Sequence, residues 1–181
     1  MASLETDPPE TPSLLPPIQE DPNPKILFVC TGNFYRSRFA EAVFNARAQA
    51  RGLPWRAFSA GLAVETSPKG LSVHALNGLR LMNIPAGFTE PRKRPFSLDI
   101  LAQADRCIAM QQTEHQPMIE STFPEISSRI QYWEVPDLPY LSPPLALTKI
   151  REGVDALIKE LVENSEMGDS KTPDPQAKPE Q

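Results

Sequence analysis

The sequence predicts an α/β fold with three layers, in which a parallel sheet is covered by helices on both faces. Four short segments typical of buried strands alternate along residues 25–165 with longer segments whose apolar residues recur at helical spacing. No internal repeat interrupts this alternation. Ligands of such sheets bind at the carboxyl ends of the strands. Chemistry is therefore expected in the loops that follow the strands.

Each element has its own support. The predicted strands are 25–29 (KILFV), 55–60 (WRAFSA), 105–110 (DRCIAM) and 129–135 (RIQYWEV). A helix is predicted at 38–51, where Ala40, Val43, Phe44 and Ala48 share one face and Gly52 follows as a stop. Another is predicted at 70–83, because Val73, Leu76 and Leu79 recur three apart. Further helices are expected after the caps Ser97 and Thr113, and at 146–164, which has the most regular apolar face.

The two ends of the chain differ from the rest in composition. Residues 1–24 hold seven prolines and five acidic residues without Lys or Arg, and residues 166–181 hold three prolines and a formal charge of −2. Such segments bury too little apolar surface to offset the entropy of ordering. We therefore predict disordered tails at 1–24 and 166–181 around one domain at 25–165. The P-x-x-P spacing from Pro9 to Pro12 leaves a ligand for a partner's aromatic groove as an alternative.

Composition and charge exclude several classes of protein. Two cysteines are too few for a disulfide scaffold, and no apolar stretch approaches the roughly 20 residues of a membrane helix. The first residues lack the basic and apolar regions of a secretory signal. The sequence thus predicts a cytoplasmic protein without a membrane partner. With tails of −5 and −2 in a chain of −5, the domain carries +2, which makes a nucleic-acid partner unexpected. The basic segment 91–95 is expected to be a solvated loop, or to steer a phosphorylated substrate.

The loop after the first predicted strand, CTGNFYRS, has the features of an oxyanion site. It leads into a helix N-terminus, whose free N–H groups and dipole favour an anion. Gly32 permits close approach of the backbone, and Asn33 tolerates left-handed geometry. Arg36 offers a planar fork that matches two phosphate oxygens. The same field would stabilise the thiolate of Cys30, and Ser37 could donate a hydrogen bond to its sulfur. These residues predict an activated nucleophile beside a bound phosphate.

The segment VCTGNFYRSRFAEAVF closely resembles the signature of the low-molecular-weight protein tyrosine phosphatases. FSAGLAVE, ADRCIAM and FPEISSRIQYWEVPDLPY resemble further segments of that family, so the resemblance covers most of the domain. It implies a four-stranded parallel sheet and hydrolysis of phosphotyrosine without a metal or other cofactor. A phosphocysteine intermediate would form and then be hydrolysed by water. The implied partner is a phosphotyrosine-containing protein or a small aryl phosphate.

The resemblance also implies roles for the loop residues. Cys30 would be the nucleophile, Arg36 the clamp on the phosphate and the transition state, Ser37 the partner of the thiol, and Asn33 the residue that fixes the loop. The loop residues expected to bind substrate are Thr31, Gly32, Asn33, Phe34, Tyr35 and Ser37.

Hydrolysis of an aryl phosphate also needs a proton donor for the leaving phenol. Asp137 follows the fourth strand, as the family's general acid does, and we expect it to protonate the phenolate and then activate water. Glu134 is the runner-up, whereas Asp105 opens a strand and is expected to be structural. The family usually has proline and an aromatic residue directly after the aspartate, but here Leu138 intervenes before Pro139 and Tyr140. Tyr140 is a candidate wall for an aromatic substrate, or a residue of the rim.

Other positions near the loop depart from the family. Tyr35 stands where many members carry a second cysteine that protects the nucleophile through a disulfide, so that Cys30 lacks this partner. Arg38 stands where proline is common and is expected to add positive charge near the site. Cys107 is expected in the core. His74 and His115 have no other residues at metal-ligand spacing, so neither is expected to bind a metal or to have a particular role.

Two other functions remain open. One is a single-cysteine arsenate reductase that passes arsenic to an external thiol. The related thioredoxin-coupled reductases need relay cysteines, and residues 80–100 contain none. The other is a phosphate-binding module without turnover, which the altered loop around Asp137 would permit.

Overall fold

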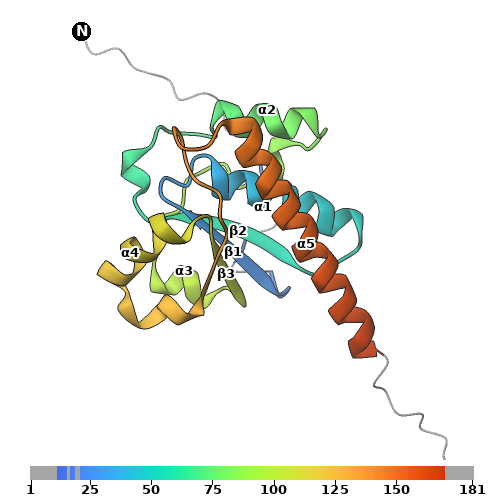
Figure 1. The fold of residues 1–181 in the computed structure, drawn as a ribbon. Helices are drawn as coiled ribbons and strands as arrows, with labels where there is room; N and C mark the ends of the chain where they lie inside the picture. The colour runs from blue at the N-terminus through green and yellow to red at the C-terminus, as the bar shows by residue number, and fades with distance from the viewer. Residues whose placement is uncertain (1–11, 16, 19–20, 170–181) are drawn as a thin grey trace, which may run out of the picture.

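A four-stranded, all-parallel sheet forms the centre of the molecule (Figure 1). The structure, a computed structural model, describes residues 12–15, 17–18 and 21–169. The strand order is β2-β1-β3-β4, so that β1 and β3 occupy the middle of the sheet. The strands are β1 (Lys25–Cys30), β2 (Arg56–Gly61), β3 (Arg106–Ala109) and β4 (Ile130–Tyr132). The predicted α/β fold with a four-stranded parallel sheet is confirmed.

Helices cover both faces of this sheet, as Figure 1 shows. The helices are α1 (Arg36–Ala50), α2 (Val73–Leu81), α3 (Leu98–Ala102), α4 (Gln112–Thr122) and α5 (Pro143–Asp169), with 3₁₀ turns at Val64–Thr66, Ala86–Phe88 and Pro124–Arg129. Side chains alternate between the two faces of a strand. Ile26 and Phe28 of β1 therefore pack in one core with α1, α2 and α5, and Leu27 and Val29 pack in a second core with α3 and α4.

The starts of the helices depend on their caps. The Ser97 hydroxyl accepts a hydrogen bond from the Ile100 N–H at 3.2 Å, which confirms the predicted cap of α3. Helix α2 begins later than the predicted residue 70, because the Ser72 hydroxyl caps it by accepting from the His74 N–H. Thr113 was the wrong cap for α4, since it lies inside the first turn and Gln111 occupies the cap position.

Helix α5 extends beyond the predicted span at both ends. It begins at Pro143, because proline fits the first turn of a helix, where its missing N–H is not needed. It reaches Asp169, so that four residues assigned to the C-terminal tail, 166–169, are helical. The rest of that tail, 170–181, lies outside the described residues.

Parts of the predicted N-terminal tail contact the domain. The Leu14 N–H donates to the Gly87 carbonyl at 2.9 Å, Ile18 is buried, and Asp21 forms a 3.4 Å ion pair with Arg56. Apolar side chains spaced among the prolines give these residues surface to bury. Residues 1–11, 16 and 19–20 of the predicted tail lie outside the described residues.

Parallel pairing places the loops of the site at one edge of the sheet. β1 pairs with β3 so that Val29 aligns with Ala109, and β3 pairs with β4 so that Ala109 aligns with Tyr132. The segments that follow these three strands therefore meet at their carboxyl ends. Within the described part of the chain, no helix is both long and apolar enough to cross a membrane.

Candidate active site

Cys30 ends β1 and is 3% exposed, and the loop that follows it is shaped by Asn33. Asn33 has a φ of 47°, in the left-handed region that asparagine tolerates. Its Oδ1 accepts a hydrogen bond from the Arg94 N–H at 2.7 Å, and its Nδ2 donates to the hydroxyls of Ser37 and Ser59 at 3.1 and 2.8 Å. The Asn33 side chain thus ties the loop to α1 and β2.

Ser37 lies against the sulfur of Cys30, with 2.9 Å between Oγ and Sγ. The Asn33 amide orientation is assigned by the Arg94 N–H, which needs an acceptor, so that Nδ2 faces Ser37. Because Ser37 Oγ accepts from Nδ2, its own hydrogen is free to point at the sulfur. This geometry supports Ser37 as a donor to Cys30.

Two glycines let other segments pack against the loop. A Cβ on Gly32 would lie 2.6 Å from Cβ of Ser67, and a Cβ on Gly61 would lie 2.7 Å from the backbone nitrogen of Asn33. Both distances are too short for real contacts. Gly32 is therefore required by close packing against Ser67, and Gly61 allows the end of β2 to pack directly against the backbone of the loop at Asn33.

Arg36 is the first residue of α1 and is 1% exposed. Its Nη1 donates to Glu114 Oε2 at 2.8 Å and to the Val135 carbonyl at 2.9 Å. Its Nη2 donates to Glu114 Oε1 and to Asp137 Oδ2, both at 2.8 Å. Burial lowers the pKa of Arg36, but the bond to Glu114 and the nearby negative charges raise it more, so that the guanidinium stays charged. Its Nε–H is buried and has no hydrogen-bond partner among the described residues.

Glu114, which sequence reasoning missed, is the second carboxylate on Arg36. Its Oε1 also accepts from the Thr31 hydroxyl at 2.5 Å and lies 3.3 Å from His115 Nε2. Burial raises the pKa of Glu114, but the bonds from His115 and Arg36 lower it further, well below its usual range. Nothing in the local sequence distinguishes this glutamate from the other acidic residues of a helix surface.

Asp137 lies in the loop after β4, and the structure brings it to Cys30 and Arg36. Its Oδ1 accepts the Leu138 N–H at 2.8 Å, and its carbonyl accepts the Tyr140 N–H at 2.9 Å, so that the loop turns directly after it. The inserted Leu138 therefore does not carry Asp137 away from the site.

A cavity of about 350 Å³ opens over Cys30. Its floor is made by the loop, and its lining includes Cys30, Thr31, Gly32, Phe34, Arg36 and Asp137. Asn33 and Ser37 are buried behind this lining and support it. Tyr35 also borders the cavity, and burial together with the charge of Asp137 raises the pKa of Tyr35 to about 12.

Three other predicted positions lie outside this cavity. Tyr140 is 85% exposed and borders a neighbouring cavity together with Asp137 and Glu114. The exposed Glu134, the runner-up acid, lines neither cavity. Asp105 accepts the Lys25 N–H at the start of β1, which is the opposite end of the strand from Cys30.

The two histidines have roles that the sequence did not indicate. His74 borders the cavity, with its ring 5.9 Å from that of Tyr35. His115 is fully buried, and its Nδ1 accepts the Gln111 N–H at 3.0 Å. Across the described residues, no group of three or more His, Cys, Asp or Glu side chains is placed to hold a metal ion.

Besides Arg36, the basic residues predicted near the site, Arg38 and those of 91–95, do not line the cavity. Arg38 is buried and donates to Thr89 Oγ1 at 3.2 Å and to the carbonyls of Gly70 and Glu90. It does not line the cavity, but its charge interacts with Cys30, so it adds positive charge near the site as expected. In the segment 91–95, Lys93 donates to the Ser67 carbonyl at 2.8 Å, and Arg94 stacks on Phe58. Through these contacts the segment 91–95 packs against the loop at Ser67 and against β2, so it is not a fully solvated loop.

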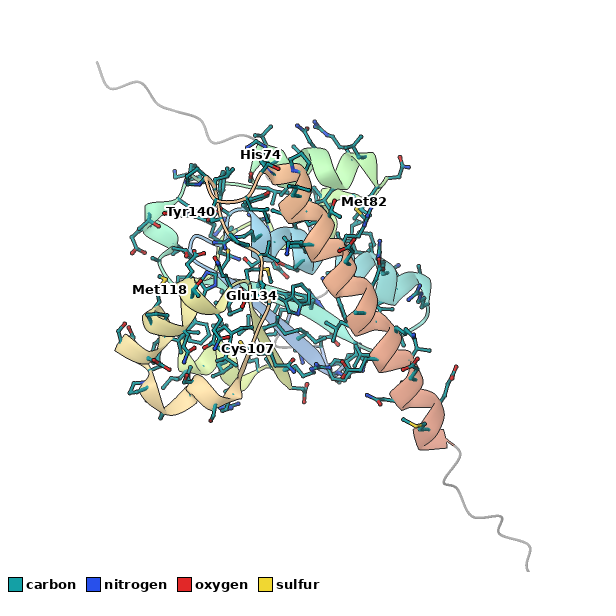
Figure 2. The ribbon with its side chains drawn as sticks, in the orientation of Figure 1. His74, Met82, Cys107, Met118, Glu134 and Tyr140 are labelled. Carbon is teal, nitrogen blue, oxygen red and sulfur yellow. The ribbon has the colours of Figure 1, made fainter. Side chains whose placement is uncertain are left out.

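Cys107 is in the core, as predicted. Figure 2 shows it near the middle of the sheet, apart from His74 and Tyr140. It belongs to the core on the α3 and α4 face, whereas Cys30 belongs to the core on the other face. Burial raises the pKa of the Cys107 thiol to about 12, which leaves it unreactive.

The site geometry agrees with a comparison of the chain with known families. Residues 25–171 match the family described as Low molecular weight phosphotyrosine protein phosphatase. The chain belongs to this family. Its members are phosphatases, and the predicted resemblance is confirmed.

Individual relatives differ in their named substrates. The protein-arginine-phosphatase of Bacillus subtilis (strain 168) is 36% identical over 99 residues, which cover 54% of this chain and 62% of that protein, less than two thirds of its length. The low molecular weight protein tyrosine phosphatase of T. tengcongensis is 29% identical, with a TM-score of 0.61, covering 78% of this chain and 99% of its own. The YwlE arginine phosphatase of Geobacillus stearothermophilus is 27% identical, with a TM-score of 0.60, covering 84% and 99%.

Proposed function

We propose that this family member is a protein tyrosine phosphatase that hydrolyses aryl phosphate monoesters. The observation that carries the proposal is the arrangement of Cys30, Arg36 and Asp137 around one cavity, in which the buried Nε–H of Arg36 finds no acceptor among the residues that the structure describes. A buried donor without a partner is costly unless a ligand accepts from it. A phosphate oxygen in the cavity is the acceptor that this donor lacks.

The reaction follows from the placement of these groups. The Cys30 thiolate attacks phosphorus while the bond to the phenolic oxygen breaks, and Asp137 gives that oxygen a proton. Water then attacks the phosphocysteine, Asp137 takes a proton from it, and inorganic phosphate leaves with the thiolate restored. Ser37, 2.9 Å from the sulfur, stabilises the leaving thiolate in this second step.

The walls of the cavity support an aromatic substrate. The lining includes Phe34, Tyr35, Val73, His74 and Leu138, which present apolar or aromatic surface. An aryl ring above the phosphate would pack against these groups.

Phosphoarginine is a second candidate substrate, which two observations favour. The relative that is 36% identical is a protein-arginine-phosphatase, and the carboxylate of Asp137, which lines the cavity over Cys30, can contact a guanidinium group. Turnover of two peptides that differ only in phosphotyrosine or phosphoarginine separates the candidates. We expect a kcat/KM at least about tenfold higher for phosphotyrosine, and the reverse order would replace the proposal with an arginine phosphatase.

The mechanism is tested with variants on an aryl phosphate. Cys30→Ser should abolish turnover, and Asp137→Ala should lower kcat by about 10²- to 10⁴-fold. Glu134→Ala is the matched control, since this exposed carboxylate lies outside both cavities, and it should keep wild-type activity. Full activity of Cys30→Ser would contradict the mechanism, and full activity of Asp137→Ala would assign the proton to another group.

The open alternatives give different results in the same assays. Phosphate binding without turnover of either phosphopeptide would indicate a binding module. Reduction of arsenate with an added thiol, without phosphopeptide hydrolysis, would indicate an arsenate reductase. The cytoplasmic location predicted from the sequence remains part of this proposal.

A further inference from the structure

Glu114 and Arg36 form a two-point contact between α4 and the phosphate loop. Both carboxylate oxygens of Glu114 accept from terminal nitrogens of Arg36, Oε2 from Nη1 and Oε1 from Nη2, each at 2.8 Å. Such a fork-to-fork contact fixes the plane of a guanidinium as well as its position. Of the groups that contact Arg36, Glu114 makes two of the four hydrogen bonds to its terminal nitrogens.

The five N–H groups of Arg36 can be assigned one by one. Glu114 takes two, the Val135 carbonyl takes the second hydrogen of Nη1, and Asp137 takes the second hydrogen of Nη2. The Nε–H has no partner among the described residues. The edge formed by Nε and Nη2 is thus the one that a phosphate could occupy, once Asp137 moves from Nη2 to the leaving oxygen.

Glu114 is itself held from two further sides. The Thr31 hydroxyl donates to Oε1 at 2.5 Å, and His115 Nε2 lies 3.3 Å from the same oxygen. The Nδ1 atom of His115 accepts the Gln111 N–H, so that the proton of the neutral ring is on Nε2, which faces Glu114. Thr31 directly follows Cys30 in the phosphate loop, so Glu114 joins the nucleophile's loop to the arginine.

We propose that Glu114 is the positioning residue for Arg36, which holds the Nε and Nη2 edge toward the bound phosphate. It acts through Arg36 and makes no contact with the reacting atoms in this assignment. This inference rests on the proposed function for its kinetic consequence, because the clamp matters most in the transition state.

The test compares Glu114→Gln and Glu114→Ala with Glu120→Gln. Glu120 is the matched control, because it lies on the same helix and its carboxylate accepts from Gln116 and Ser127 on the exposed side. In Glu114→Gln the side-chain NH₂ would face an N–H group of Arg36, and because both groups are donors, one of the two hydrogen bonds would be lost. We expect kcat/KM for an aryl phosphate to fall about 10- to 100-fold in both Glu114 variants and to change less than twofold in Glu120→Gln.

Chemical rescue separates positioning from a merely structural role. Added formate should raise kcat/KM of Glu114→Ala at least about tenfold, because a free carboxylate can accept from the N–H groups of Arg36 that Glu114 no longer contacts. It should not raise kcat/KM of wild type. Wild-type kcat/KM in Glu114→Gln would overturn the inference. So would a loss of activity that formate does not restore and that parallels a fall in melting temperature.

A readout without turnover keeps this inference separate from the proposed function. In ¹⁵N NMR, added inorganic phosphate should shift the Arg36 Nε–H signal in wild type and in Glu120→Gln, and shift it less than half as far in Glu114→Gln. An equal shift in all three proteins would overturn the inference. If wild type hydrolyses no phosphopeptide yet shows the expected shifts, the proposed function fails and the role of Glu114 stands.

Discussion

The two carboxylates on Arg36 belong to regions that hold them very differently. Glu114 sits in the first turn of α4, its side chain is 27% exposed, and it has contacts to Arg36, Thr31 and His115. Asp137 sits in the loop after β4, its side chain is 41% exposed, and a single hydrogen bond joins it to Arg36. Equal distances of 2.8 Å to the same guanidinium therefore do not imply equal roles.

The difference shows how one arginine can serve two purposes. A carboxylate fixed from several sides orients the guanidinium before substrate arrives, which lowers the cost of organising the site during the reaction. A carboxyl group with a single contact to the arginine, and otherwise only the local bond from the Leu138 N–H, can leave the arginine and, in its protonated form, deliver a proton to the leaving oxygen. The helix supplies the carboxylate with more contacts and less exposure, and the loop supplies the one with fewer contacts and more exposure.

Replacement of the shared arginine should have the largest effect. Arg36→Lys removes the planar fork that contacts both carboxylates and phosphate, and kcat/KM for an aryl phosphate should fall about 10²- to 10³-fold. Arg38→Lys is the control, because Arg38 is equally buried but donates to Thr89 and to carbonyls away from the cavity. It should lower the melting temperature and leave kcat nearly unchanged. Less than a tenfold loss in Arg36→Lys would mean that catalysis does not depend on the planar fork that Glu114 is proposed to orient.

The next largest effect should be a difference between Asp137→Ala and Glu114→Ala in how their loss of activity depends on the leaving group of the substrate. A phenol of low pKa needs little protonation, so the loss in Asp137→Ala should shrink as the leaving group improves. The loss in Glu114→Ala should stay near its 10- to 100-fold value across the series, because orientation of Arg36 matters for every substrate. The measurement is kcat/KM for a series of aryl phosphates. If kcat/KM depended on the pKa of the leaving phenol equally in the two variants, the proposed division of roles would be wrong.

Acid stability should show the smallest difference. The pKa of Glu114 is held below its usual range in the folded protein, despite the opposing effect of burial. Its contribution to the free energy of unfolding is then fully present above the unfolded pKa of about 4.3 and is lost as pH falls through the folded value. Denaturant unfolding between pH 7 and pH 3 should therefore show a flatter decline below about pH 5 for Glu114→Gln than for wild type. The exposed-site variant Glu134→Gln should follow wild type, and a Glu114→Gln curve parallel to both would refute this expectation.

The sequence predicted the sheet and its helices well, because each depends on local periodicity. Of the boundaries that failed, those at Ser72 and Pro143 depend on a single hydrogen bond and on proline. The cap predicted at Thr113 and the extent of the strand predicted at 129–135, which is limited to Ile130–Tyr132, also failed. The segment 12–24 was assigned to a tail from its composition, although Ile18 and Asp21 find partners on the domain. Average composition does not reveal such single contacts.

The amino-acid sequence by itself determined the phosphate loop. Cys30, Asn33, Arg36 and Ser37 lie within one strand-to-helix turn, so their spacing fixes their geometry, and the 2.9 Å contact between Ser37 and Cys30 follows from it. Asp137 could be proposed because a strand end precedes it. Only the tertiary structure decided the role of Glu114, which is 78 residues from Arg36 in the chain. The strand order puts β3 beside β1, so that the helix after β3 begins next to the loop after β1. No local pattern in the sequence predicts that these two segments are neighbours.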